Sequence, residues 1–177
     1  MSKVFRRKAF LKVTVAAGLV AFFAGTTAAV AIVEPHTTPS YAHGGGYQVK
    51  SWVDTSFCID VAPGGTQGRA VTLSQCFSAA ASERWTFTKN SDGSNLIVDS
   101  QGMCVDSVGR KAGDGIAVKV RNCSFVKSQR FRVTNLGQIQ LSGTTTCLAI
   151  PRAGAGVALL LETCSNSNPW QVFKWSQ

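Results

Sequence analysis

The sequence predicts an all-β domain, and three observations lead to that prediction. After residue 46, three pairs of cysteines recur at nearly constant spacing, short segments alternate apolar and polar residues, and no segment sustains a helical period over three turns. Composition agrees, because 45% hydrophobic and 15% charged residues are typical of a globular chain, and 17 Gly against 5 Pro indicates many turns. A length of 177 residues excludes two large domains.

The first 42 residues have the pattern of a secretory signal peptide. Positions 1–12 contain five basic residues and no acidic one, and positions 13–33 carry no charge. Small residues permit cleavage after Ala31 or after Ala42, and we favour the second. An uncleaved membrane anchor is the alternative, because about 20 apolar residues span a bilayer. Cleavage after Ala42 would leave a flexible lead-in at 43–46 and reduce the net charge from +9 to +5, with 13 basic and 8 acidic residues remaining.

A threefold repeat organises the chain from residue 47 to residue 177. Cysteines pair at separations of 18, 19 and 17 residues, and an aromatic residue follows each second cysteine by nine, eight and nine positions. These aromatic residues are Trp85, Phe131 and Phe173. The repeats span about 47–91, 92–135 and 136–177.

Each repeat is expected to contain four strands. The first precedes the opening cysteine, near 48–53, 96–99 and 138–141, and the second starts at that cysteine, over 58–61, 104–107 and 147–150. A third strand leads into the closing cysteine, and its alternation assigns these residues to the core: Val71, Leu73, Val118, Val120, Leu159 and Leu161. The fourth ends the repeat, over 84–88, 130–134 and 172–175. A short turn of helix could form between 78 and 84.

Twelve strands in three equivalent units favour closure into a barrel with a hairpin cap, because each unit can then bury its apolar face against the other two. That architecture is the β-trefoil. The repeat also selects one disulfide pairing among the 15 that six cysteines allow, with one bridge inside each unit: Cys58–Cys76, Cys104–Cys123 and Cys147–Cys164. Zinc is not expected, because the cysteine spacing is too long for zinc knuckles and the only histidines are His36 and His43.

The sequence of the repeat resembles that of the ricin B-type β-trefoil lectin family, whose members also occur as carbohydrate-binding modules of bacterial glycosidases. The resemblance rests on a cysteine, a hydrophobic residue and Asp, then a Gly-rich turn, an alternating strand into the second cysteine and a closing Gln-x-aromatic motif. It covers about residues 47 to 176. The first unit departs from the closing motif, with Glu83 where the others have Gln129 and Gln171. The aromatic residue of the motif is expected in the core.

The resemblance implies sugar sites that are degraded in every unit. The aspartate of the opening strand, which accepts hydrogen bonds from sugar hydroxyls, is present as Asp60 and Asp106 but replaced by Ala149. The stacking aromatic residue is replaced by Ser74, Arg121 and Glu162, and the amide before the closing motif by Ser82, Ser128 and Trp170. Phe77 and Phe125 follow closing cysteines and could replace the missing rings, but packing against the disulfides is the stronger expectation.

The first two units therefore carry the expected sugar-binding residues: Asp60, Ser82, Asp106, Lys119, Arg121, Ser128 and Gln129. Each aspartate could instead be a structural residue bonded to local backbone amides. In the second unit, Lys119 and Arg121 beside Asp106 suggest an anionic polysaccharide as the ligand. The third unit lacks the aspartate and places Leu160 and Trp170 outward, so no sugar site is expected there.

The sequence predicts a secreted, non-catalytic lectin-like protein that binds a glycan weakly. The alternative is a secreted protein-interaction subunit, part of a toxin or surface complex, that has lost sugar binding; the outward Ala158 and Leu160 favour it. No enzyme activity or cofactor is expected, because the histidines lie near the N-terminus and Asp60 and Asp106 belong to different units. Nucleic acid is not an expected partner, since the basic residues of 92–135 are scattered, and no membrane span remains after cleavage.

Overall fold

The computed structural model describes residues 46–62 and 67–177. The predicted signal peptide, most of the lead-in including His43, and the turn residues Gly64 and Gly65 lie outside the described residues. Twelve strands and four short 3-10 helices make up the described part. The strands are β1 (Gln48–Ser51), β2 (Phe57–Val61), β3 (Val71–Gln75), β4 (Thr86–Lys89), β5 (Asn95–Val98), β6 (Met103–Ser107), β7 (Ile116–Asn122), β8 (Phe131–Val133), β9 (Ile139–Leu141), β10 (Thr146–Ala149), β11 (Leu160–Thr163) and β12 (Phe173–Ser176).

Six of these strands close a barrel. β1 pairs with β12, β4 with β5 and β8 with β9, all antiparallel. Three further contacts join the pairs: the bridge between Tyr47 and Trp85, the pairing of Asn95 with Phe131, and the bridge between Gln138 and Val172. The ring of pairings therefore returns to its starting strand, so the barrel has no free edge.

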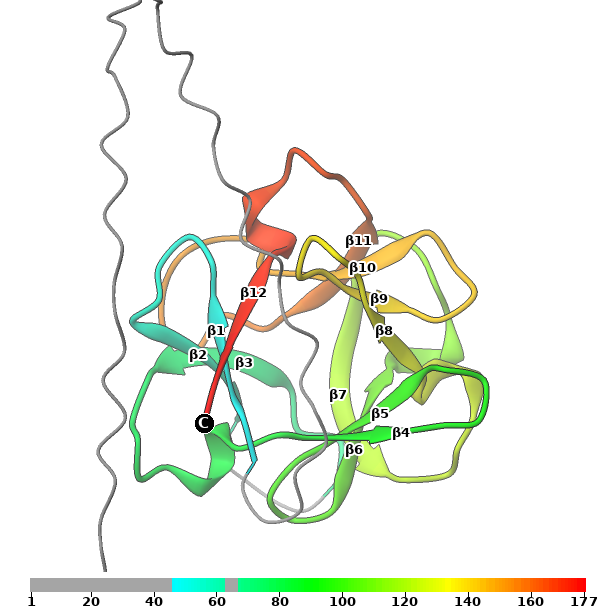
Figure 1. Cartoon of the computed structure of the whole chain (residues 1–177), viewed down its shortest axis with the longest axis horizontal. Helices are drawn as coiled ribbons and strands as arrows, with labels where there is room; N and C mark the ends of the chain where they lie inside the picture. The colour runs from blue at the N-terminus through cyan, green and yellow to red at the C-terminus, as the bar shows by residue number, and fades with distance from the viewer. Residues whose placement is uncertain (1–45, 63–66) are drawn as a thin grey trace, which may run out of the picture. The chain divides into compact units, whose positions relative to one another are not determined.

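The other six strands form three hairpins, β2–β3, β6–β7 and β10–β11, that meet around one axis (Figure 1). β7 and β11 pair directly, with Leu160 opposite Ala117, and single bridges link Ala70 to Lys119 and Thr72 to Ala158. A closed barrel with a cap of three hairpins is the β-trefoil, which confirms the predicted fold.

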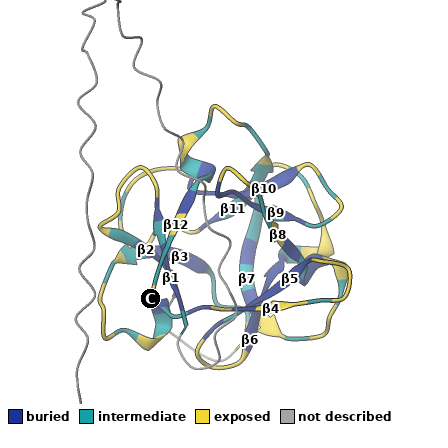
Figure 2. Ribbon diagram, viewed as in Figure 1, coloured by how far each residue is buried: buried dark blue, intermediate teal, exposed yellow. Residues whose placement is uncertain are grey.

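The core lies where the alternation predicts it (Figure 2). All six core residues predicted on the third strands are at most 1% exposed. The aromatic residues of the closing motifs, Trp85, Phe131 and Phe173, are also at most 1% exposed, and the Trp85 indole donates to the Ile59 carbonyl at 2.9 Å. These three residues are therefore barrel residues, as expected.

The three predicted disulfides are present, Cys58–Cys76, Cys104–Cys123 and Cys147–Cys164, and no described cysteine is free. Each joins the second strand of a unit to the end of the third, with 5.0 Å between Cα atoms in every case. Each hairpin is thus fastened in the same way.

Short 3-10 helices precede the closing strand of every unit: η1 (Ala81–Glu83), η3 (Lys127–Gln129) and η4 (Pro169–Gln171). Only the first was anticipated. The second unit has an additional one, η2 (Val108–Arg110), after its second strand. Gly109 and Arg110 both have positive φ there, 70° and 58°, so the chain turns sharply and carries the Arg110 side chain outward from the hairpin.

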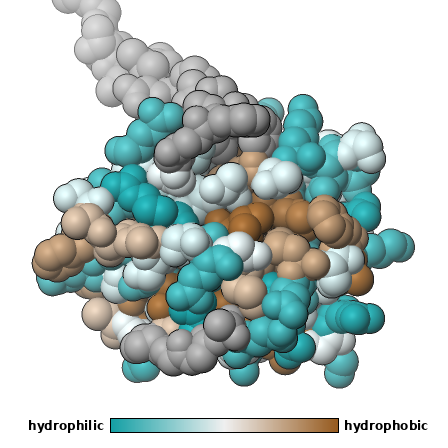
Figure 3. Space-filling model, turned by 90° about the horizontal axis from the view of Figure 1, so that it is seen from below, coloured by the Kyte–Doolittle hydropathy of each residue, from teal (hydrophilic) through white to brown (hydrophobic). Residues whose placement is uncertain are grey.

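The expectation that Phe77 and Phe125 pack against the disulfides is wrong, because they are 68% and 59% exposed. Each follows its cysteine at a point where the chain leaves the hairpin toward the 3-10 helix. On the face seen in Figure 3, an apolar area near the centre is bordered by hydrophilic side chains.

Candidate functional site

The strand register places the family position of each unit at an equivalent point of its hairpin. Asp60 lies opposite Thr72, Asp106 opposite Lys119, and Ala149 opposite Leu160. The three units therefore present the same backbone with different chemistry: a carboxylate beside a hydroxyl, a carboxylate beside an amine, and two apolar side chains.

In the second unit, Asp106 is 5% exposed and is held by a side chain from η3. The Gln129 amide donates to Asp106 Oδ2 at 3.0 Å and to the Asn122 carbonyl at 2.9 Å, while Gln129 Oε1 accepts from the Ser124 amide at 2.8 Å. The other carboxylate oxygen, Asp106 Oδ1, is buried and has no hydrogen-bond partner among the residues that the structure describes. One acceptor is thus fixed and the other is unsatisfied.

A pocket of about 410 Å³ lies against this carboxylate, and we refer to it as the Asp106 pocket. It gathers residues from the hairpin, from η2 and η3, and from the end of a first-unit loop. Its lining is polar except for Gly109: Gln67, Asp106, Ser107, Gly109, Arg110, Arg121, Asn122, Ser124 and Gln129. Arg121 enters it as the sequence predicts. Lys119 lies opposite Asp106 in the strand pair but is not part of this lining.

In the first unit, the aspartate is only half-buried and is bonded to its own strand. Asp60 Oδ1 accepts from the Val61 amide at 2.6 Å. Glu83, at the position of Gln129, does not donate to it. Its oxygens instead accept from Ser74 Oγ at 3.1 Å, from Gln48 Nε2 at 2.8 Å and from the Phe77 amide at 2.8 Å. The neighbouring Ser82 is half-buried on η1.

In the third unit, the closing glutamine is in place but has no carboxylate to hold. Gln171 accepts from the Ser165 amide at 2.8 Å and donates to the Thr163 carbonyl at 2.9 Å, which are the same two backbone contacts that Gln129 makes in the second unit. Ala149 is fully buried, and Trp170 packs half-buried against the core. The glutamine therefore has a structural role in every unit where it occurs.

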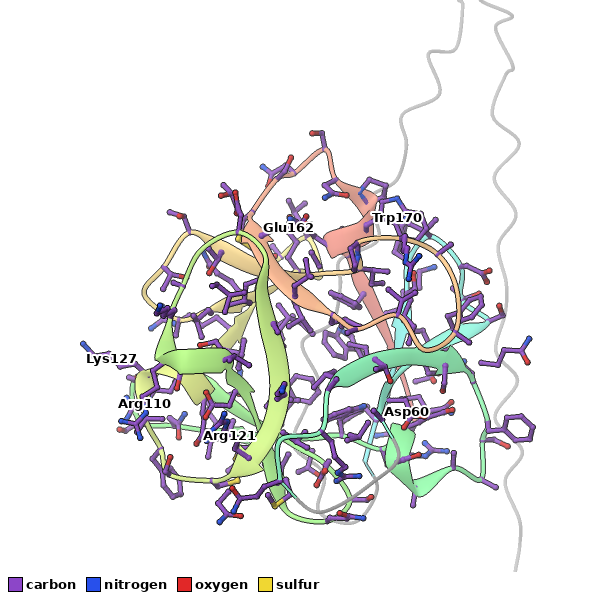
Figure 4. All side chains as sticks on the ribbon, turned by 180° about the vertical axis from the view of Figure 1, so that it is seen from behind. Asp60, Arg110, Arg121, Lys127, Glu162 and Trp170 are labelled. Atoms are coloured by element: carbon purple, nitrogen blue, oxygen red, sulfur yellow. A yellow bond between two sulfur atoms is a disulfide. The ribbon has the colours of Figure 1, made fainter. Side chains whose placement is uncertain are left out.

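Ser128 lies apart from the Asp106 pocket. It lines a second hollow of about 390 Å³, formed by η2, η3 and the turn between β9 and β10. We refer to this hollow as the cationic pocket, because four basic side chains line it: Arg110, Lys111, Lys127 and Arg130. Arg110 lines both pockets, and Figure 4 shows Arg110, Arg121 and Lys127 on one side of the domain with Asp60 on the other.

Within the described ranges, no three histidine, cysteine, aspartate or glutamate side chains gather as metal ligands would. The same residues include no helix of the length and apolarity that a membrane crossing requires. Three disulfides suggest an extracellular protein, because such bridges persist in oxidising surroundings.

Comparison with known families gives one match, in which the model described as the ricin-type beta-trefoil lectin domain covers residues 93–177. The second and third units are therefore similar to the ricin B-type β-trefoil lectin family. The match includes the second and third units, whose closing motifs carry glutamine, and it leaves out the first, where Glu83 departs from the motif. No curated protein matches the sequence.

Solved structures share the trefoil at low identity. The designed threefold-symmetric protein ThreeFoil has a TM-score of 0.66 and 18% identity, over 74% of this chain and 97% of that one. The earthworm R-type lectin C-half, solved in complex with GalNAc, has a TM-score of 0.55 and 14% identity, over 75% and 98%. A Polyporus squamosus lectin bound to a Neu5Ac-containing epitope has a TM-score of 0.65 and 15% identity, over 78% and 50%. These similarities establish the β-trefoil fold, which lectins of known structure share.

Proposed function

We propose that this β-trefoil protein is secreted and non-catalytic, and that it binds a glycan weakly through the Asp106 pocket. The observation that carries the proposal is the unsatisfied Asp106 Oδ1, a buried acceptor at the wall of a polar pocket. A buried acceptor without a partner is unfavourable by about 1–3 kcal/mol, and a sugar hydroxyl that donates to it would remove that penalty.

Gln129 is the positioning residue of this site. Its amide fixes Asp106 Oδ2, so the remaining oxygen has one orientation before a ligand arrives. Arg121, Asn122 and Ser124 supply donors around the same pocket. A carboxylate is well suited to this role because both of its oxygens only accept hydrogen bonds.

Weak affinity follows from the composition of the pocket. Its lining contains no aromatic side chain among the described residues, so nothing there can stack on the apolar face of a sugar ring. Binding then depends on hydrogen bonds exchanged with water, each of which contributes only about 0.5–1.5 kcal/mol.

The experiment is a glycan array followed by calorimetry on the best ligand. Asp106→Asn should weaken binding about 10- to 100-fold, because an amide replaces an acceptor oxygen with a donor and removes the charge. Asp60→Asn is the matched control and should have a smaller effect, since Asp60 is half-buried and bonded to its own backbone. Unchanged binding by the variant that combines Asp60→Asn with Asp106→Asn would exclude the Asp106 pocket as the glycan site.

Export is the second part of the proposal. The basic segment, the uncharged segment and the three disulfides all support secretion, with residues 1–42 removed and His43 as the first residue. Intact-mass measurement of protein from the culture medium checks the cleavage position. Protein retained in the membrane fraction with residues 1–12 intact would contradict it.

A protein-interaction role remains the alternative outcome of the array. Of the two apolar residues that favoured it in the sequence, Ala158 is exposed and Leu160 is half-buried, so Leu160 offers less surface than its outward parity suggests. If the folded protein binds no glycan on the array, the protein-interaction role is the one supported.

A further inference from the structure

The cationic pocket has a strong excess of positive charge. It is lined by four basic side chains and one acidic side chain, Asp92. The side chains of Arg110, Lys111 and Lys127 have no hydrogen-bond or ion-pair partner in the part of the chain that the structure describes. They come from two separate segments, η2 with its following residue and η3, so they approach the pocket from different directions.

The back wall of the pocket is held in place by the fourth cation. Arg130 pairs with Asp92 at 2.8 Å and donates twice to the Phe125 carbonyl, at 3.1 and 2.9 Å. Hydrogen bonds from the Ser94 hydroxyl and amide lower the pKa of Asp92 to about 2, and Arg130 lowers it further in the same direction. Asp92 is therefore ionised at neutral pH and neutralises Arg130, which leaves the other three cations uncompensated.

A buried hydroxyl completes the pocket. Ser128 is 4% exposed, and its Oγ has no hydrogen-bond partner among the described residues. Ser142, in the turn between β9 and β10, and the buried Leu141 also line the pocket. An unpaired buried hydroxyl is unfavourable, and it could donate a charge-assisted hydrogen bond to an anionic oxygen.

We propose that the cationic pocket binds a tetrahedral oxyanion, a phosphate or sulfate group, carried by the glycan whose hydroxyls the Asp106 pocket accepts. The claim that a glycan carries the anion rests on the proposed function, whereas the anion site itself does not. Donors reach the pocket from η2, η3 and the β9–β10 turn, so the anion must accept from three directions. A tetrahedral group offers three or four oxygens, whereas a planar carboxylate offers two.

The two pockets are joined by one residue. Arg110 lines both of them, at the point where the positive φ of Gly109 and Arg110 turns the chain outward. A sugar seated against Asp106 would place a neighbouring charged substituent beside this guanidinium. Lys119 and Arg121 are the residues that the sequence suggests for an anion, whereas the cationic pocket offers Arg110, Lys111 and Lys127.

The experiment is an NMR titration of the secreted protein with inorganic phosphate and with sulfate, at constant ionic strength and with chloride as the reference. We expect amide shifts at Lys111, Ser128 and Gly143 that chloride does not produce. Lys111→Ala with Lys127→Ala should abolish them, while Arg152→Ala with Lys174→Ala, which removes two exposed charges elsewhere, should not. Equal shifts with chloride, or equal loss in both double variants, would overturn the site in favour of diffuse electrostatic attraction.

Ser128→Ala tests whether the pocket is built for the anion. The variant removes an unpaired buried hydroxyl, so stability should be unchanged or slightly higher while the phosphate and sulfate shifts weaken. A structural serine would instead lower the melting temperature on replacement. Lower stability with unchanged anion shifts would therefore contradict the inference.

A third experiment tests whether the pocket binds the anion when a sugar carries it, by comparing the affinities of charged and neutral sugars. A sulfated or phosphorylated sugar should bind about tenfold tighter than its neutral parent, and the Lys111/Lys127 double variant should lose that preference while still binding the neutral sugar. Asp106→Asn should weaken both sugars and leave the phosphate shifts intact. Retained phosphate shifts with no sugar binding in any variant would defeat the proposed function and the glycan part of this inference, but not the anion site.

Discussion

In the first and second units, an aspartate occupies the same position of the same hairpin, with Thr72 opposite one and Lys119 opposite the other. The side chain at the closing-motif position of each unit differs by a single group, a carboxylate oxygen in Glu83 and an amide nitrogen in Gln129. Gln129 donates to Asp106, whereas Glu83 accepts from Ser74, Gln48 and Phe77. The comparison shows that the side chain behind the aspartate decides how the carboxylate is held: Gln129 fixes one oxygen of Asp106, whereas Asp60 is bonded to the Val61 amide of its own strand.

The largest effect is expected from removing one disulfide. Cys104→Ala with Cys123→Ala should lower the free energy of unfolding by about 3 kcal/mol and also weaken glycan binding, because Asn122 and Ser124 of the Asp106 pocket flank Cys123. Removing Cys58–Cys76 should reduce stability similarly and leave binding unchanged. Denaturant unfolding and calorimetry measure the two effects, and equal loss of binding in both variants would remove the distinction between the units.

A smaller effect is expected from Gln129→Glu, which gives the second unit the side chain of the first. Two carboxylates would then face each other in a buried place, so stability should fall by about 1–3 kcal/mol and glycan binding should decrease. The stability loss should shrink near pH 4, where one carboxyl takes up a proton. Unfolding curves at two pH values test this.

The third unit supplies the control for that variant. Gln171→Glu also loses a backbone contact, to Thr163, but has no neighbouring aspartate. It should reduce stability without changing glycan binding. Loss of binding in both variants would indicate a general effect of destabilisation on the lectin.

The smallest effect is expected from the reverse exchange, Glu83→Gln. The amide can donate to Ser74 where the carboxylate now accepts, so stability should change by less than about 1 kcal/mol. In an Asp106→Asn background, the new donor should raise residual glycan binding a few-fold by orienting Asp60. Calorimetry on the double variant measures this, and no gain would mean that more than this amide separates the first unit from the second.

The fold was largely predictable because it repeats. The cysteine spacing, the alternation and the buried aromatic residue each occur three times and predict the same strands. An irregular position in one unit therefore does not obscure the pattern. The sequence also predicted that Arg121 and Gln129 lie around Asp106, and all three line one pocket, because the position of each relative to a cysteine follows the repeat.

The rest of the site was not predictable from local pattern. The short 3-10 helix η3 interrupts the alternation and carries Ser128 away from Gln129, its neighbour in the sequence, into another pocket. Arg110 belongs to η2, which only the second unit has, and Gln67 comes from a different unit. A glycine directly before Arg110 was the one available signal that the chain could turn there.

The pairing of β1 with β12 has a consequence for how the protein reaches its folded state. Gln48 lies opposite Ser176, so residues 128 positions apart must meet before the barrel is complete. A chain still being synthesised or threaded through a membrane pore cannot form this seam, because its last strand is not yet available. The hairpins are local and can assemble early, but closure of the barrel has to wait until β12 is available to pair with β1.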